Sequence, residues 1–183
     1  MKNKNLEQKF KYIGQFNDGL ALAKDENYVY KFIDINGQII FDVKEKIESQ
    51  IPQEKILGFE NIKDFNDGFA IIEYLNHEYL SRTTAIDTHG NIIIAPDKIK
   101  KIEYGDGLFL CTGKDNYHFY VDKKGYLAIQ EKFHIATPFE NGVATVGNYY
   151  SQYMIDKQGN ILKQIKGEEN KVHEKTICLE PKK

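Results

Sequence analysis

The sequence predicts an all-β protein of four tandem three-stranded antiparallel β-meanders, forming a solenoid- or propeller-like array with one short helical insertion. Two observations support this fold class. Two short patterns, each a turn followed by an apolar run, occur four times along the chain. The composition also favours strands, because 12 of the 183 residues are Tyr and 11 are Phe, while only four are Pro. Aromatic residues are enriched on pleated, half-buried surfaces.

The first pattern is an aromatic residue, two variable residues, Gly and an apolar run. It occurs as "FNDGLALA" from Phe16, "FNDGFAII" from Phe65, "YGDGLFLC" from Tyr104 and "FENGVATV" from Phe139. Its glycines, Gly19, Gly68, Gly107 and Gly142, lie 49, 39 and 35 residues apart, spacings typical of solenoids, propellers and arrays. We interpret it as a turn that leads into a strand, such as Leu20–Lys24 or Val143–Gly147.

The second pattern is an apolar residue followed by Asp-x-x-Gly: "IDINGQII", "IDTHGNII", "VDKKGYLA" and "IDKQGNIL". Asp is favoured at the first position of a type I turn, and Gly at the fourth supplies the left-handed conformation that closes a three-residue hairpin loop. A ring of calcium-binding carboxylates is less favoured, because a calcium loop needs several oxygen ligands close together in sequence. The predicted structural turns are Asp34 with Gly37, Asp87 with Gly90, Asp122 with Gly125, and Asp156 with Gly159.

The two patterns define the expected organisation. We expect an N-terminal lead-in over 1–15, a single domain of four repeats over 16–165, and a charged tail or capping strand over 166–183. The repeats are placed at about 16–64, 65–103, 104–138 and 139–165. The first contains an insertion between Phe41 and Lys63, predicted to form a short helix around Val43–Ser49 that breaks near Pro52. One short meander cannot bury a face alone, so the four repeats must pack against each other.

These residues resemble the bacterial tryptophan-glycine (WG) repeat family, whose consensus is similar to F-x-x-G-L-A-x-V followed by W-G-Y-I-D-x-x-G-x-x-V-I. The matching segments are "FNDGLALA", "FIDINGQII", "AIDTHGNIIIAP" and "FYVDKKG", and the likeness covers about 16–162. The repeats are degenerate, since the Trp-Gly pair is replaced in all four and the chain has no Trp. The resemblance implies a repeated β-meander that acts as an interaction module, without catalytic residues to transfer.

Composition and charge narrow the classes of partner. The net charge is −2, with 25 basic and 27 acidic residues interspersed. No basic face or tail stands out that could bind along a phosphate backbone, so no nucleic-acid partner is expected. Two Cys fit a reduced compartment better than a disulfide scaffold. No signal-like or membrane-spanning apolar run occurs, which predicts a cytoplasmic protein without a membrane partner, monomeric in isolation.

No catalytic constellation stands out in the sequence. It contains no G-x-S-x-G, no P-loop and no G-x-G-x-x-G. Cys111 lies in the apolar run "GLFLC", where a buried inert thiol is expected rather than a nucleophile. We therefore expect no enzyme activity, no cofactor and no metal site.

Recognition is expected on the middle strands and the loops before them, at 25–30, 75–83, 115–119 and 148–153. Loops on a rigid scaffold are the usual place for binding residues. The aromatic residues of the middle strands are either core between repeats or an exposed strip for a ligand, and the core reading is favoured. The partner is expected to be another protein, with an inhibitor or immunity-type role as one hypothesis and a cell-wall or surface glycan as the alternative. The candidate anchors are Tyr30, Tyr79, Tyr117 and Tyr149.

Overall fold

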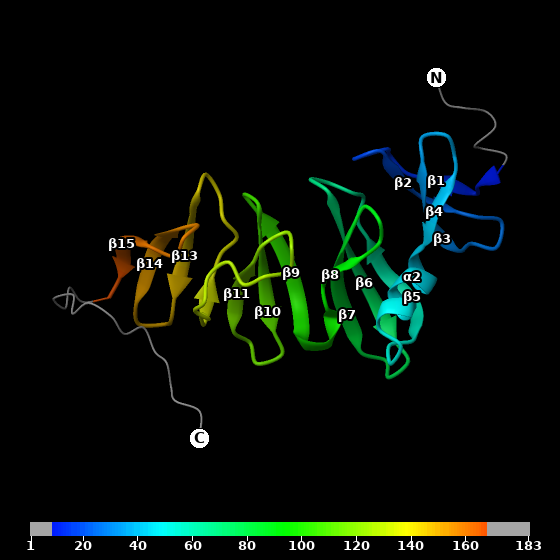
Figure 1. Ribbon diagram of the computed structural model, residues 1–183. Coiled ribbons are helices and arrows are strands. Elements are labelled where there is room, and N and C mark those ends of the chain that lie inside the picture. Colours follow the sequence, from blue (N-terminus) through cyan, green and yellow to red (C-terminus); the bar gives the residue numbers. More distant parts are fainter. Residues whose placement is uncertain (1–8, 168–183) are drawn as a thin grey trace. The chain divides into compact units, whose positions relative to one another are not determined.

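The computed structural model describes residues 9–167, which form four antiparallel sheets and one short α-helix (Figure 1). This confirms the prediction of a mostly β chain with a short helix between Phe41 and Lys63. The expected tail or capping strand beyond residue 167 lies outside the described residues. In the described part of the chain, no helix has the length and apolar character needed to cross a bilayer.

The first two sheets each contain four strands in sequence order. The first consists of β1 (Tyr12–Ile13), β2 (Leu20–Lys24), β3 (Tyr30–Asp34) and β4 (Ile39–Asp42). The second consists of β5 (Ile56–Ile62), β6 (Phe69–Asn76), β7 (Ser81–Asp87) and β8 (Ile92–Ile94). A single 3₁₀ turn, η1 (Pro96–Lys98), follows β8. Every pairing is antiparallel between neighbours in the chain, as in a meander.

The third and fourth sheets continue the same order. The third contains β9 (Ile99–Gly105), β10 (Leu108–Gly113) and β11 (His118–Val121). The fourth contains β12 (Ile135–Ala136), β13 (Val143–Gly147), β14 (Gln152–Asp156) and β15 (Ile161–Lys166). In the third sheet, an isolated bridge between Val121 and Leu127 takes the place of a fourth strand.

The expected three-stranded meander is wrong in its strand count, because a strand precedes the first turn of every sheet. These first strands are β1, β5, β9 and β12. Two of them, β1 and β12, have only two residues, and β5 contains two register shifts, so these three show no regular alternation that the sequence could reveal. The sheets therefore have four, four, three and four strands.

The helix α2 (Val43–Gln50) begins where the Asp42 side chain accepts a hydrogen bond from the Glu45 backbone N–H. An Asp at this position satisfies one of the free N–H groups of the first turn. Val43 and Ile47 lie one turn apart on the same face and are fully buried. They belong to the core between the first two sheets, so the helix covers part of that core.

Contacts divide the chain into two compact units, Met1–Ile102 and Glu103–Lys183. In each unit, two sheets pack face to face, with inward side chains alternating along their strands. In the first unit, Leu20, Leu22 and Phe32 pack with Ala70, Ile72 and Ile86. In the second, Leu108, Leu110 and Tyr120 pack with Ala144, Val146 and Ile155. The opposite face of the first sheet (Ala21, Ala23, Ile33) is covered by Phe10, with Ile13 and Phe16 packed beside it.

The middle strands are less accessible than expected. In β7, every residue from Arg82 to Ile86 is buried, and Phe32 in β3 and Tyr120 in β11 are fully buried core residues. These aromatic side chains lie between packed sheets, as in the core reading. Tyr28 does not share a strand face with Tyr30 and Phe32, because it lies in the loop before β3. Most of the exposed tyrosines lie in loops and turns, whereas Tyr12, which is 51% exposed, lies in β1.

Candidate functional site: the tyrosine loops and the groove of the first unit

Two kinds of turn recur in all four sheets. The first is a two-residue turn, here called the Asx-Gly turn: Asp18–Gly19, Asp67–Gly68, Asp106–Gly107 and Asn141–Gly142. Both residues of each have positive φ, the geometry that matches the twist of the adjoining strands. Asp and Asn tolerate this conformation better than other side chains, which explains their presence.

The second is the Asp-x-x-Gly turn, in which the aspartate caps its own loop. Asp34 Oδ1 accepts hydrogen bonds from the backbone N–H groups of Asn36 and Gln38, at 2.9 and 2.8 Å. Asp87, Asp122 and Asp156 accept the equivalent pairs. The glycines at the fourth position, Gly37, Gly90, Gly125 and Gly159, have φ between 76° and 87°. These carboxylates serve the turns, and no group of three His, Cys, Asp or Glu within residues 9–167 is placed to hold a metal ion.

A third set of loops, the tyrosine loops, joins the second and third strands of the four-stranded sheets and β10 to β11. They are 25–29, 76–80, 113–117 and 148–151. In the first, Asp25 Oδ1 accepts hydrogen bonds from the N–H groups of Asn27 and Val29, and Tyr28 N–H donates to the Asp25 carbonyl. Asn76 makes the same three bonds with Glu78, Leu80 and Tyr79. These two loops therefore have the geometry of the Asp-x-x-Gly turn.

The left-handed position of these two loops carries a tyrosine instead of a glycine. Tyr28 has φ of 62° and Tyr79 has φ of 59°. A bulky residue in this conformation is a genuine outlier, since its Cβ crowds the backbone. Both side chains nevertheless point into solvent, with exposures of 68% and 76%. The third loop has Asn116 at this position, with φ of 63°.

The candidate anchors occupy different environments. Tyr79 and Tyr149 lie at loop tips and are highly exposed. Tyr30 is half-buried in β3, and its ring meets the Phe59 ring edge-on, with centroids 5.5 Å apart. Tyr117 is half-buried against His134, with ring centroids 4.4 Å apart. The structure thus gives two exposed tips and two partly packed rings.

Within the tyrosine loops, two exposed tyrosines are not among the candidate anchors, Tyr28 and Tyr150. Tyr28 alternates with Tyr30, a spacing that favours a strand, yet the Asp three residues before it marks the same turn as Asp34 before Gly37. Tyr150, adjacent to Tyr149 at the tip between β13 and β14, is 83% exposed. The turn before β3 is therefore marked in the sequence by Asp25, but Tyr28 takes the place of the usual glycine.

The residues that flank the Tyr79 loop belong to a buried polar cluster of Glu54, Asn76 and Arg82. Glu54 is buried and accepts hydrogen bonds from Asn76 Nδ2 at 3.2 Å and from Arg82 Nε at 3.4 Å. Arg82 Nη2 also lies 3.8 Å from the Glu78 carboxylate. A buried ion pair with additional hydrogen bonds fixes the groups it joins, although its net contribution to stability is small. This cluster fixes both ends of the loop that carries Tyr79.

A groove of about 410 Å³ lies in the first unit, beside the Tyr28 loop. One side is formed by Tyr12 and Lys24 from β1 and β2, together with Tyr28 and Tyr30. The other side is formed by Glu60, Asn61 and Ile62 of β5. The groove therefore combines three aromatic rings with a few polar groups, the usual composition of a binding site.

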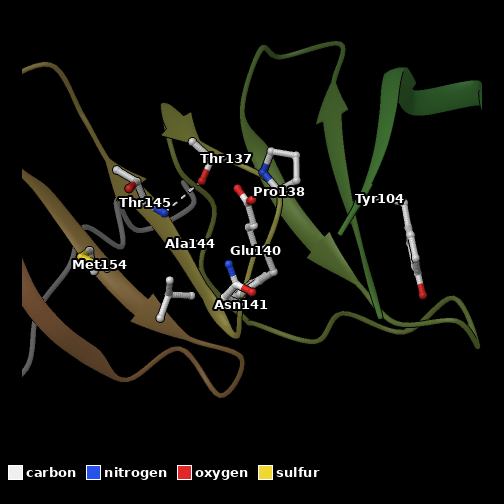
Figure 2. A pocket seen from close by; sticks show the side chains of 10 residues that line it. Tyr104, Thr137, Pro138, Glu140, Asn141, Ala144, Thr145 and Met154 are labelled. Atoms are coloured by element: carbon white, nitrogen blue, oxygen red, sulfur yellow. Dashed lines mark hydrogen bonds between the residues drawn. The ribbon is translucent and has the colours of Figure 1, made fainter. Parts of the chain in front are cut away.

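A wider hollow of about 720 Å³ lies in the second unit (Figure 2). Figure 2 shows Thr137 and Glu140 from the β12–β13 segment, and Thr145 and Met154 from β13 and β14. Thr137 Oγ1 accepts a hydrogen bond from the Thr145 N–H at 3.0 Å. Glu140 is the one carboxylate among the lining residues, so the hollow lacks the paired carboxylates often used in general acid–base catalysis.

Cys111 is fully buried in β10, and burial raises the pKa of its thiol to about 12. The thiolate is the reactive form of cysteine, and its charge is disfavoured in an apolar environment. The geometry therefore matches a packing role for Cys111. Its neighbours in β10 are the buried apolar residues Phe109 and Leu110.

No protein-family model matches the chain, and no curated protein matches it. Among solved structures, the designed protein Ika8 matches with a TM-score of 0.41 and 13% identity, over 84% of this chain and 48% of that one. A protein of unknown function from Bacteroides caccae gives 0.35 and 12%, over 84% and 59%. BamB from Moraxella catarrhalis gives 0.39 and 14%, over 84% and 49%. The chain spans about half the length of these structures, and likeness at this level carries no functional argument.

Proposed function

We propose that this chain is a non-enzymatic interaction module that binds another protein through its tyrosine loops. The observation that carries the proposal is the pair Tyr28 and Tyr79, exposed side chains held in a left-handed backbone conformation at equivalent positions of two sheets. An inhibitor or immunity-type role is one form of this proposed function.

Turns of the same geometry carry different residues at their left-handed position. In the Asp-x-x-Gly turns, which have the same geometry, the left-handed residue is glycine, as at Gly37 and Gly90. A side chain there costs about 1 kcal/mol relative to glycine. Tyr28 and Tyr79 recover little of that cost by packing, since most of each side chain faces solvent. Backbone strain of this kind clusters at recognition sites, and tyrosine is enriched among the residues that dominate binding energy.

The scaffold that presents these loops is proposed to be an array of four degenerate WG-like repeats, solenoid- or propeller-like in form. The recurrence of the Asx-Gly and Asp-x-x-Gly turns in all four sheets supports this interpretation. In such an array the recurring turns preserve the meander, while the tyrosine loops differ in their side chains and the fourth loop, 148–151, also differs in length. Differences confined to loops on a constant scaffold suit recognition.

A glycan is the second candidate ligand, and the groove of the first unit favours it. Tyr12, Tyr28 and Tyr30 line that groove together with Asn61 and Glu60. Aromatic faces combined with a few hydrogen-bonding groups suit a sugar ring, which has an apolar face and a polar rim. A protein partner remains the main proposal because the exposed tyrosines extend to loops outside the groove, at Tyr79, Tyr149 and Tyr150.

The test is affinity capture from the source cell, comparing the wild-type chain with a variant in which Tyr28, Tyr79 and Tyr149 are each replaced by Asn. We expect the wild type to retain a specific protein that the variant does not, with unchanged circular dichroism. Oligosaccharides released from the same beads would be analysed in parallel. Equal capture by both chains would reject the tyrosine loops as the binding surface, and capture of oligosaccharide alone would favour the glycan.

A further inference from the structure

The side chains of Tyr12, Lys24 and Tyr30 form a row across the first sheet, next to the loop that joins β2 to β3. Lys24 lies directly opposite Tyr12 of β1 on one side and Tyr30 of β3 on the other. Directly opposite residues in antiparallel strands place their side chains on the same face. The Lys24 ammonium lies over the Tyr30 ring, with Nζ 4.4 Å from the centroid. The Lys24 ammonium thus contacts the Tyr30 ring, and Tyr12 lies opposite Lys24 on the same face of the sheet; all three residues line the groove.

Within residues 9–167, the two lysines that line this groove take part in no ion pair. Of the described residues, none places a carboxylate within salt-bridge distance of Lys24 or of Lys11, the second lysine that lines the groove. Lys31, by contrast, is held between Asp25 and Asp42 at 3.4 and 3.0 Å. The one groove carboxylate, Glu60, accepts hydrogen bonds from Ser81 Oγ.

The fold does not require this row. At the positions of Lys24 and Tyr30, the third sheet has Thr112 and His118, joined by a hydrogen bond of 3.1 Å between Oγ1 and Nδ1. The fourth sheet has Gly147 and Gln152 at the same places. Strand pairing forms equally well with those residues, so the aromatic and cationic row belongs to the first repeat and not to the scaffold.

We propose that the groove of the first unit binds a carboxylate-bearing, extended segment of the partner protein. This inference rests on the proposed function and adds the chemistry of the segment. Lys24 and Lys11 supply two ammonium groups to a carboxylate, and the rings of Tyr12, Tyr28 and Tyr30 contact the apolar part of the segment. A half-buried ammonium beside aromatic rings interacts more strongly with an anion than a fully solvated one. A neutral glycan would leave both charges unused.

The probe is an acetylated and amidated hexaglutamate peptide, added to the ¹⁵N-labelled full chain and followed by NMR. We expect saturable shifts of the backbone amides of Tyr12, Tyr28 and Asn61, and an affinity that falls as salt is raised. Lys24→Gln should weaken binding by about threefold or more, whereas Lys24→Arg should retain it. The matched control is Lys44→Gln, a lysine on α2 that does not line the groove.

A second pair of variants separates the groove from the loop tips. Tyr28→Asn should weaken hexaglutamate binding, while Tyr79→Asn, which changes the same turn position outside the groove, should not. The proposal is overturned if hexalysine or chitohexaose shifts the groove amides and hexaglutamate does not, or if Lys24→Gln binds as the wild type does. If the captured partner is lost with Tyr79→Asn yet unaffected by Lys24→Gln, the proposed function stands and the groove proposal fails. If neither tyrosine nor lysine variants affect the captured partner, both fail.

Discussion

The carboxylate of Asp18 accepts a hydrogen bond from the backbone N–H of Gly68, at 2.8 Å between Oδ2 and N. These residues are 50 positions apart and lie in the Asx-Gly turns of the first and second sheets. Asp106 makes the equivalent bond to Gly142 in the second unit, at 2.6 Å. The aspartate of one turn thus joins its sheet to the next, in addition to tolerating the positive φ of its own turn.

The first prediction concerns this link between sheets. Asp18→Gly should lower the free energy of unfolding by about 1 kcal/mol, because the charged acceptor is lost while glycine keeps the positive φ. Asp18→Asn keeps an acceptor oxygen and should lose less. Urea denaturation measures both, and amide hydrogen exchange at Gly68 should accelerate in the glycine variant. Wild-type stability and exchange in Asp18→Gly would contradict the link.

The second prediction concerns the Asp-x-x-Gly turns. Gly37→Ala and Gly125→Val should each destabilise the protein, since these glycines have φ of 78° and 87°. The expected cost is about 1 kcal/mol for Ala and more for the β-branched Val. Tyr79→Gly, at the same position of an equivalent turn, should have the opposite sign. Melting temperatures by circular dichroism decide the matter, and unchanged melting in both glycine variants would reject the turn assignment.

The third prediction compares two buried tyrosines. Tyr120 Oη donates a hydrogen bond to the Thr137 carbonyl at 2.7 Å, whereas the buried Tyr74 Oη has no hydrogen-bond partner among the described residues. Tyr120→Phe should therefore cost about 1 kcal/mol, while Tyr74→Phe should be neutral or stabilising. Chemical denaturation of the two variants gives the comparison. A larger loss for Tyr74→Phe than for Tyr120→Phe would contradict it.

The fourth prediction concerns acid stability. The hydrogen bond from the Gln38 backbone N–H is the main cause that lowers the pKa of Asp34, and the Asn160 side chain is the main cause for Asp156. A carboxyl whose pKa is lower in the folded than in the unfolded state stabilises the fold above its unfolded pKa of about 4. That contribution is lost as the pH falls through the folded pKa.

Thermal melts between pH 7 and pH 2 measure this effect. Asp34→Asn keeps a turn-forming side chain but does not titrate, so its melting temperature should fall less steeply below pH 4 than that of the wild type. Gln38→Ala, which retains the backbone N–H, serves as the control and should leave the acid dependence unchanged. Identical acid profiles for Asp34→Asn and the wild type would show that this turn does not contribute.

The turns could be predicted because their causes are local. Asp34 and Gly37 interact over four residues, so the residue types and their spacing specify the loop before any packing occurs. The apolar runs after Gly19 and Gly142 likewise predicted the bounds of β2 and β13. Near-continuous apolar runs of this length, bounded by turns, are typical of buried strands.

Other features depend on long-range contacts and could not be predicted. The pair Tyr12–Ile13 is a strand only because β2 offers an edge for it. The burial of β7 depends on packing that its polar sequence "SRTTAID" does not suggest, and the Arg82–Glu54 pair joins residues 28 positions apart. The left-handed backbone conformation of Tyr28 and Tyr79 could not be predicted for a different reason, because this turn position favours glycine rather than tyrosine.

The central claim is that Tyr28 and Tyr79 are retained for binding at a cost to the fold. The most direct test measures the melting temperature and the affinity for the captured partner of Tyr28→Asn and Tyr79→Asn. Asn tolerates the left-handed conformation. The account predicts that both variants melt at or above the wild-type temperature, and that each binds the partner more weakly, by about 1 kcal/mol or more. Variants that melt lower and bind as tightly as the wild type would show that these tyrosines serve the fold, and would contradict the account.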